Sequence, residues 1–126
     1  MQELRPATTY ADFDPAILAH DIVEIASDKK ASDVLLLDLR PLTTFTDFFV
    51  IMNGTSSVQI RALSENIQER LEDEGIRSLH AEGSPEDGWI LIDYGPVVVH
   101  VFRPEQRAYY GLEELWRGAT TVVRIQ

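Results

Sequence analysis

The feature that most constrains the fold is a pair of apolar segments, residues 89–94 and 97–102, separated only by Gly95-Pro96. This spacing is typical of an antiparallel hairpin with a two-residue loop. Pairing then runs outward from the turn until Trp89 lies opposite Phe102, and alternation sorts the side chains onto two faces. The apolar face, which predicts a core, carries Ile90, Ile92, Tyr94, Val97, Val99 and Val101. The mixed face carries Trp89, Leu91, Asp93, Val98, His100 and Phe102.

The mixed face has two interpretations. Two large aromatic side chains beside a carboxylate and an imidazole are typical of a partly hydrated contact surface, and an antiparallel hairpin can leave one face in water. Alternatively, a helix covers this face, Trp89 belongs to the core, and His100 hydrogen-bonds to Asp93 or to a backbone carbonyl. The pattern favours neither interpretation.

A first amphipathic helix is predicted over residues 14–30. Asp14 can accept hydrogen bonds from the free N–H groups of the first turn, and Pro15 fits the first helical position. Its apolar residues recur at helical spacing, which predicts one buried stripe.

A second helix is predicted to begin at Ser56, where Gln59 completes a capping box, and to end at Gly75. Its apolar stripe predicts packing on a sheet. Its outer face carries three acidic residues that can steer a basic partner, Glu65, Glu69 and Glu72.

Three further strands are predicted between these elements. Residues 33–39 form an almost continuous apolar run, typical of a strand covered on both faces. Residues 48–52 predict a second strand, and residues 76–82 a weaker third strand followed by an exposed loop over residues 83–88.

After the hairpin, a short helix is predicted over residues 103–110, ended by Gly111. Residues 112–116 add a turn or two, and residues 120–125 have the pattern of a short edge strand.

This order of elements predicts a single α/β domain with a mixed sheet of about five strands flanked by helices. We place the domain at residues 14–118, after a flexible arm over residues 1–13 and before a C-terminal tail over residues 119–126.

Composition excludes several classes of protein. The 126 residues include 11 Lys and Arg against 21 Asp and Glu, a net charge of −10, which argues against a phosphate-gripping nucleic-acid binder and against an anionic membrane surface. With no cysteine, the chain has no disulfide and no zinc–thiolate site. No apolar run reaches about 18 residues, and the polar start is unlike a signal peptide, so we expect a cytoplasmic protein.

Catalytic, cofactor and metal sites are not predicted. His80 and Glu82 share a strand face, and together with Asp93 and His100 they contain the ligand types of a metal site. Their spacing in the sequence, however, is unlike that of zinc-binding motifs. The segment 54–57 starts a helix, where hydroxyls usually cap, and the chain has too few glycines for a phosphate-binding loop.

An aromatic cluster follows the hairpin: Tyr109, Tyr110 and Trp116, with Leu112 and Leu115. Helical spacing makes a core role common for such residues, whereas tyrosine and tryptophan are also frequent anchors where proteins meet. Both roles stay open.

Several motifs, in this order between Ile17 and Trp116, resemble the ribosomal silencing factor family, also called Iojap-like. They are Lys30-Ala31-Ser32-Asp33-Val34, Thr46-Asp47-Phe48-Phe49-Val50-Ile51, Gly54-Thr55-Ser56-Ser57, Asp87-Gly88-Trp89-Ile90-Leu91-Ile92-Asp93-Tyr94-Gly95, Val97-Val98-Val99-His100-Val101-Phe102 and Tyr110-Gly111-Leu112-Glu113-Glu114-Leu115-Trp116. The resemblance implies binding to large-subunit ribosomal protein L-fourteen, on the face that meets the small subunit. It further implies that this binding hinders subunit joining and lowers translation when nutrients are short.

The resemblance also implies a fold similar to that of nucleotidyltransferases. Those enzymes use a Gly-Ser pair at a helix start and two acids, one residue apart, on the next strand. Gly54 and Ser56 match the first element, but residues 76–82 lack the paired acids. Because two-metal chemistry then has no ligands, we expect no enzyme activity.

From the mixed face and the family motifs, the predicted partner-binding residues are Trp89, Asp93, Tyr94, His100, Tyr109 and Tyr110. Tyr94 is included on the motif alone, because alternation puts it on the core face. The resemblance also allows a homodimer away from the ribosome. A nucleotide-binding or phosphotransfer enzyme, and an acidic binding module for another basic partner, are the alternatives.

Overall fold

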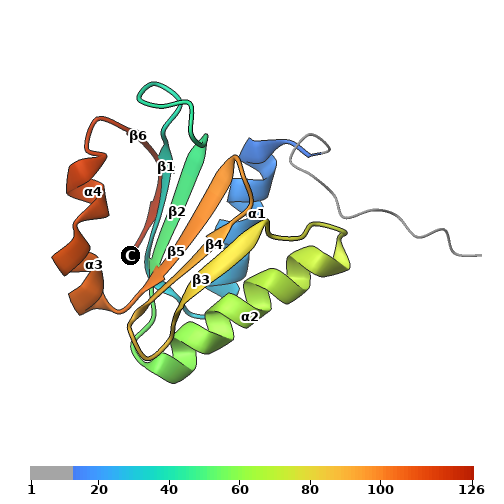
Figure 1. Ribbon diagram of the computed structural model, residues 1–126, viewed down its shortest axis with the longest axis vertical. Helices are drawn as coiled ribbons and strands as arrows, with labels where there is room; N and C mark the ends of the chain where they lie inside the picture. The colour runs from blue at the N-terminus through green and yellow to red at the C-terminus, as the bar shows by residue number, and fades with distance from the viewer. Residues whose placement is uncertain (1–12) are drawn as a thin grey trace, which may run out of the picture.

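The predicted hairpin forms the middle of one mixed sheet. The computed structural model describes residues 13–126, and its strands lie in the order β3-β4-β5-β2-β1-β6 (Figure 1). The strands are β1 (Ser32–Asp38), β2 (Phe48–Asn53), β3 (His80–Ser84), β4 (Trp89–Asp93), β5 (Val97–Phe102) and β6 (Thr120–Ile125). The helices are α1 (Pro15–Asp28), α2 (Ser57–Asp73), α3 (Pro104–Tyr110) and α4 (Leu112–Leu115). The predicted α/β class is confirmed, with six strands instead of about five.

The register of the hairpin agrees with the prediction. Trp89 pairs with Phe102, and the Tyr94 backbone N–H donates to the Val97 carbonyl at 2.9 Å, so Gly95-Pro96 is the whole loop. β5 pairs in parallel with β2, whereas the other neighbouring strands are antiparallel. The two predicted faces of the hairpin are therefore real faces of the sheet.

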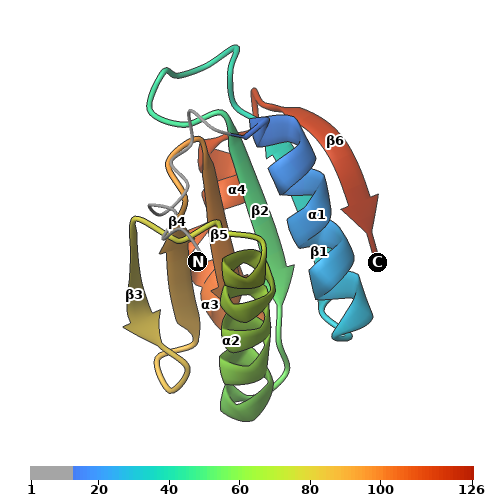
Figure 2. The ribbon, with the colours of Figure 1, turned by 90° about the vertical axis from the view of Figure 1, so that its right-hand side faces the viewer.

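Two helices, α1 and α2, cover the apolar face (Figure 2). Asp14 caps α1 by accepting from the Ala16 N–H at 2.9 Å, and Ser56 caps α2 by accepting from the Gln59 N–H at 3.1 Å. The predicted capping box differs in its second half, because the Gln59 side chain accepts from Thr55 N–H instead of from Ser56. These caps satisfy the backbone groups of helices whose apolar stripes pack on the sheet.

The second face of the sheet is only partly covered. The segment that contains α3 and α4 packs over a smaller core cluster on this side, opposite α1 and α2 (Figure 2). The cluster is Leu35, Leu37, Leu39, Phe49, Ile51 and Phe102, with Trp89, Val98, Leu112, Trp116 and Ala119 packed against it. β1 is thus buried on both faces, as its apolar run predicts, whereas β3 and part of β4 remain uncovered.

The third strand lies later in the chain than predicted. The strand is His80–Ser84 instead of residues 76–82, and the turn begins at residue 85 instead of 83. Ser84 pairs with Trp89, so β3 and β4 form a second tight hairpin. The apolar pattern misplaced the bounds of this strand because all its residues are exposed or half-exposed at the sheet edge, where no core requires apolar side chains.

The C-terminal bound of the domain also differs from the prediction. The predicted edge strand over residues 120–125 is confirmed as β6, which pairs with β1, although the domain boundary was placed before it. The sheet therefore extends beyond the predicted boundary at residue 118. The predicted flexible arm lies outside the described residues except for Phe13, which packs against the main core.

Candidate protein-docking surface

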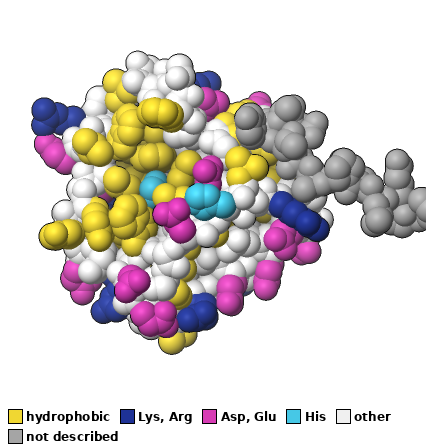
Figure 3. Space-filling model, viewed as in Figure 1, with side chains coloured by type: hydrophobic (Ala, Val, Ile, Leu, Met, Phe, Trp, Pro, Cys, Tyr) yellow, Lys and Arg dark blue, Asp and Glu magenta, His cyan; other side chains and the backbone are white. Residues whose placement is uncertain are grey.

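The uncovered half of the second face contains a hollow of about 440 Å³. Figure 3 shows apolar side chains gathered there around two histidines and two acidic residues. The walls come from β2, β3, β4 and β5, the loop before β2, and the residue after α4. They are Thr43, Phe45, Thr46, Phe49, His80, Glu82, Leu91, Asp93, Gly95, Val98, His100 and Trp116. A concave apolar surface with a few polar groups is a common form of binding site.

Trp89 lies at the edge of this half-covered face. Its ring stacks on Phe102 with 4.9 Å between centroids and contacts Tyr110 at 4.5 Å. Its indole Nε1 donates a hydrogen bond to His100 Nδ1 at 3.2 Å. Trp89 is half-buried, so both interpretations of the mixed face hold in part: α3 covers one side of the ring and the other side reaches the surface.

His100 supports the surface from below, because only 3% of it is exposed. Burial lowers the pKa of His100 to about 3, so the ring is neutral near pH 7. Since Nδ1 accepts from Trp89, the proton is on Nε2, which has no hydrogen-bond partner among the described residues. The bond from His100 to Asp93 or to a backbone carbonyl, which belonged to one of the two interpretations of the mixed face, is not formed; the hydrogen-bond partner is the indole of Trp89.

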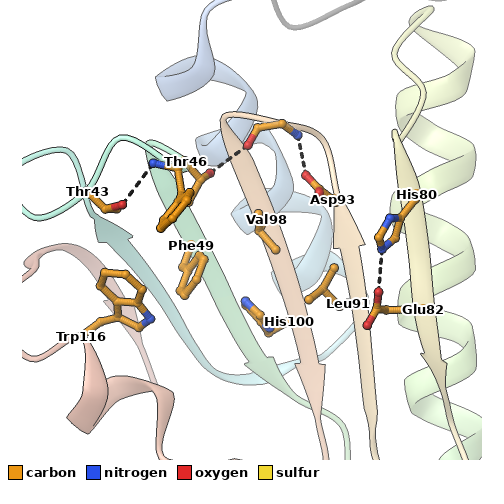
Figure 4. Close-up of a pocket in the computed structure, with 12 residues that line it drawn as sticks. Thr43, Thr46, Phe49, His80, Glu82, Leu91, Asp93, Val98, His100 and Trp116 are labelled. Atoms are coloured by element: carbon orange, nitrogen blue, oxygen red, sulfur yellow. Dashed lines mark hydrogen bonds and ion pairs between the residues drawn. The ribbon is translucent and has the colours of Figure 1, made fainter.

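Asp93 lies at the rim of the hollow. Its Oδ1 accepts from the Gly95 N–H at 2.7 Å, and on the neighbouring strand His80 Nε2 and Glu82 Oε2 are 2.7 Å apart (Figure 4). The side chains considered for a metal site therefore share this face with His100. Nevertheless, within residues 13–126 no three His, Cys, Asp or Glu side chains are grouped so that they could hold a metal ion.

Tyr94 is not part of this surface. Only 2% of it is exposed, because alternation along β4 puts it on the face that α1 and α2 cover. Burial there raises the pKa of its hydroxyl well above the ordinary value. The prediction that Tyr94 contacts the partner is therefore wrong, because a partner cannot reach its side chain without removing a helix.

The two tyrosines of α3 lie at the surface and not in the core. Tyr109 is 81% exposed, and its ring meets that of Tyr110 edge-on at 5.1 Å. Tyr110 is half-exposed and leans on Trp89, so the structure brings three of the predicted partner-binding residues together.

Two residues outside the predicted partner-binding set also line the hollow. Phe45 is 91% exposed in the loop before β2, and Trp116 contacts Phe49 across the hollow at 5.8 Å. The available signal for Phe45 was a large apolar side chain in a turn-rich polar segment. Trp116 belongs to the aromatic cluster for which the sequence left both a core and an interface role open.

Arg107, which no sequence pattern singled out, holds α3 and α4 in place. Its Nη1 donates to the Asp33 carbonyl at 2.6 Å and to Asn53 Oδ1 at 2.9 Å. Its Nε and Nη2 donate to the two carboxylate oxygens of Glu113 at 2.9 and 3.1 Å. Only 7% of Arg107 is exposed, so this fork fastens the segment that carries Tyr109 and Tyr110 to the sheet.

The acidic stripe of α2, formed by Glu65, Glu69 and Glu72, is exposed. Because α2 covers the first face of the sheet (Figure 2), the stripe lies across the sheet from the hollow, which is on the second face. The carboxylates nearest to the hollow are instead Asp93 and Glu82.

None of the helices described is long and apolar enough to span a lipid bilayer.

Comparisons with known proteins agree with the resemblance in the motifs. A family model described as "Ribosomal silencing factor during starvation" matches residues 13–126. The chain is 41% identical over 100 residues to ribosomal silencing factor RsfS of Halalkalibacterium halodurans, covering 79% of this chain and 86% of that protein. It is 38% identical over 117 residues to chloroplastic protein Iojap of Zea mays, covering 91% of this chain and 51% of that protein.

A crystal structure of a protein from Chromobacterium violaceum has the same fold, with a TM-score of 0.80 at 32% sequence identity, covering 88% of this chain and 94% of that chain. The family match covers all the described residues, and the fold and the sequence relatives agree with it. This chain therefore belongs to the ribosomal silencing factor family.

Proposed function

We propose that this protein binds ribosomal protein L-fourteen of the large subunit and thereby keeps the small subunit from joining, which represses translation when nutrients are limiting. The observation that carries the proposal is the aromatic group at the partly covered second face of the sheet, where Tyr109 and Tyr110 are exposed and Trp89 is half-buried. We define the docking surface as Trp89, Asp93, Tyr109 and Tyr110, with His100 as its buried support. Membership of a family named for ribosome silencing supports the partner class.

The composition of the docking surface suits a protein partner. Tyrosine and tryptophan bury a large area at low entropic cost and are common among the residues that dominate binding energy. Trp89 is held by Phe102, Tyr110 and its hydrogen bond to His100, so it is already ordered before a partner arrives. Pre-organisation of this kind reduces the entropy lost on binding.

Net charge supports a basic protein partner on a particle rich in RNA. A charge of −10 attracts basic ribosomal proteins and repels phosphates, so contact is directed to protein and away from RNA. We accordingly expect binding to weaken as salt is raised.

The proposed mechanism is steric and needs no reaction. A domain fixed by about 800 Å² of its own surface, the usual size of a stable contact, occupies the space that the small subunit needs. The protein then acts in the cytoplasm, where subunits join. A homodimer away from the ribosome remains a prediction.

The alternative of a nucleotide-binding or phosphotransfer enzyme has less support. The Ser56 hydroxyl is engaged as the cap of α2, and the segment from Ile76 to β3 has no pair of acids one residue apart. Magnesium-dependent nucleotide binding in calorimetry is the result that would revive this alternative. A different basic partner would use the same docking surface.

Cosedimentation with purified ribosomal subunits tests the proposal. We expect recovery with large subunits, competition by purified L-fourteen, and slower subunit joining in light scattering. Trp89→Ala is expected to weaken binding at least about tenfold. Val58→Ala, at an exposed position on α2, is the control. Recovery with small subunits only, or full inhibition of joining by a folded Trp89→Ala variant, would contradict the proposal.

A further inference from the structure

We infer that the hollow on the docking side takes one basic side chain of the partner, an arginine or a lysine, whose carbon chain lies on the apolar floor and whose cation pairs with Asp93 and Glu82. This inference rests on the proposed function, because it names the chemistry that the partner presents to the same surface.

The floor of the hollow suits the carbon chain of a long side chain. Leu91 on β4 and Val98 on β5 are diagonal neighbours, and Phe49 on β2 pairs with Val98 and extends the apolar floor towards Trp116 (Figure 4). A volume of about 440 Å³ is large enough to admit a whole side chain from a partner. Lysine and arginine regularly bury their methylene groups on such surfaces while the charged end reaches a polar rim.

The rim of the hollow is acidic. Of the twelve residues drawn around it, Asp93 and Glu82 are carboxylates, and none is lysine or arginine (Figure 4). The carboxylate of Asp93 uses Oδ1 for the Gly95 N–H, whereas none of the described residues donates to its Oδ2. That oxygen is the acceptor we assign to the incoming cation.

Glu82 is placed to add to the same contact. His80 pairs directly with Asp93, and Glu82 pairs with Leu91, so the two carboxylates are diagonal neighbours on one sheet face. Glu82 already lies against His80, with 2.7 Å between Oε2 and Nε2. Its contribution to the cation is therefore smaller than that of Asp93.

Other occupants fit less well. A metal ion lacks ligands, because no three of the described His, Cys, Asp or Glu side chains are grouped to hold one. A purely apolar side chain would remove two carboxylates from water without any compensating partner, which is costly. An acidic group would be repelled by the carboxylates of both Asp93 and Glu82.

The test measures the dissociation constants of variants in which one carboxylate is replaced by an amide of the same shape. Binding is measured to purified L-fourteen and to large subunits. Asp93→Asn keeps an oxygen for the Gly95 N–H while it removes the charge. We expect its dissociation constant to rise about tenfold or more, and that of Glu82→Gln to rise by less. Glu69→Gln removes an equal charge from the exposed outer face of α2 and is expected to change affinity less than about twofold.

A double-mutant cycle then identifies the partner residue. Exposed arginines and lysines of L-fourteen are changed to Gln one at a time, against wild type and Asp93→Asn. One of them is expected to be non-additive with Asp93→Asn, because each change removes the same contact. Circular dichroism and thermal melts confirm that the variants remain folded.

The outcomes separate the two proposals. If Asp93→Asn binds like Glu69→Gln while Trp89→Ala still weakens binding, this inference is overturned and the proposed function stands. If the effect of Asp93→Asn is additive with that of every Gln substitution in the partner, this inference is also overturned and the proposed function stands. If the wild-type protein binds neither L-fourteen nor large subunits, the proposed function fails and this inference fails with it.

Discussion

The indole Nε1 of Trp89 donates a hydrogen bond to Nδ1 of His100, with 3.2 Å between the two nitrogens. This contact joins a half-buried residue of the docking surface to a buried imidazole on the next strand. It determines which ring nitrogen of His100 carries the proton, and it holds the indole ring in one orientation.

Trp89→Phe is expected to lower the free energy of unfolding by about 1–2 kcal/mol beyond the loss of ring contacts, because it leaves both nitrogens of a buried imidazole without a partner. Urea denaturation followed by circular dichroism measures this. Trp116→Phe is the matched control, since no described residue accepts a hydrogen bond from its indole. Equal losses in the two variants would show that the hydrogen bond contributes nothing.

The free energy of unfolding is expected to decrease as the pH is lowered below about 6.5, because of His100. Its pKa is lowered to about 3 in the folded protein, so between pH 3 and 6.5 the unfolded chain binds a proton that the folded protein does not. Stability then rises with pH across this window, by up to about 1.4 kcal/mol per unit from this residue alone, and is fully present above pH 6.5.

The measurement for this pH dependence is the free energy of unfolding at several pH values for wild type and His100→Gln. The variant is expected to have a smaller slope between pH 4 and 6.5. His20→Gln, at an exposed position on α1, is the control. Parallel curves for wild type and His100→Gln would refute the assignment.

Arg107→Met is expected to loosen α3 and α4 more than the rest of the domain. The change leaves the Asn53 Oδ1 and the Asp33 carbonyl without their donor and removes the ion pair with Glu113, at a cost of roughly 2 kcal/mol or more. Hydrogen exchange should therefore accelerate in residues 104–115 while α1 and α2 stay protected.

Docking should weaken in the same Arg107→Met variant, because Tyr109 and Tyr110 lose their fixed position. Glu113→Gln keeps one acceptor oxygen for the guanidinium and is expected to have a milder effect. Unchanged exchange in residues 104–115 of a folded Arg107→Met variant would mean that aromatic packing alone holds this segment.

Neutralising the α2 stripe is expected to have little effect on docking. The three residues Glu65, Glu69 and Glu72 are exposed on α2, which packs on the sheet face that the hollow does not occupy, and charges beyond a Debye length of about 8 Å are largely screened at physiological salt. The triple change to Gln should alter the association rate less than about twofold in stopped-flow binding at 0.15 M salt. A larger decrease would restore the steering role that the sequence pattern suggested for this stripe.

Local patterns were sufficient for much of the fold. The Gly95-Pro96 spacing predicted the hairpin and its register, because a two-residue loop leaves one pairing and alternation is built into extended backbone. Asp14 and Ser56 predicted the starts of α1 and α2, because capping involves atoms only a few residues apart. The family motifs lie in the same segments.

Contacts between distant segments decided the surface. The mixed face of the hairpin is the same in sequence whether covered or open, and its state depends on where Arg107 fastens α3 and α4 to β1 and β2. That is why Tyr109 and Tyr110, for which the sequence left both a core and an interface role open, are exposed, and why His100 is buried. Pairing of β6 with β1 is equally a matter of distant segments. The residues themselves thus determined which faces exist, by periodicity and turn geometry, and tertiary packing alone decided which of them a partner can reach.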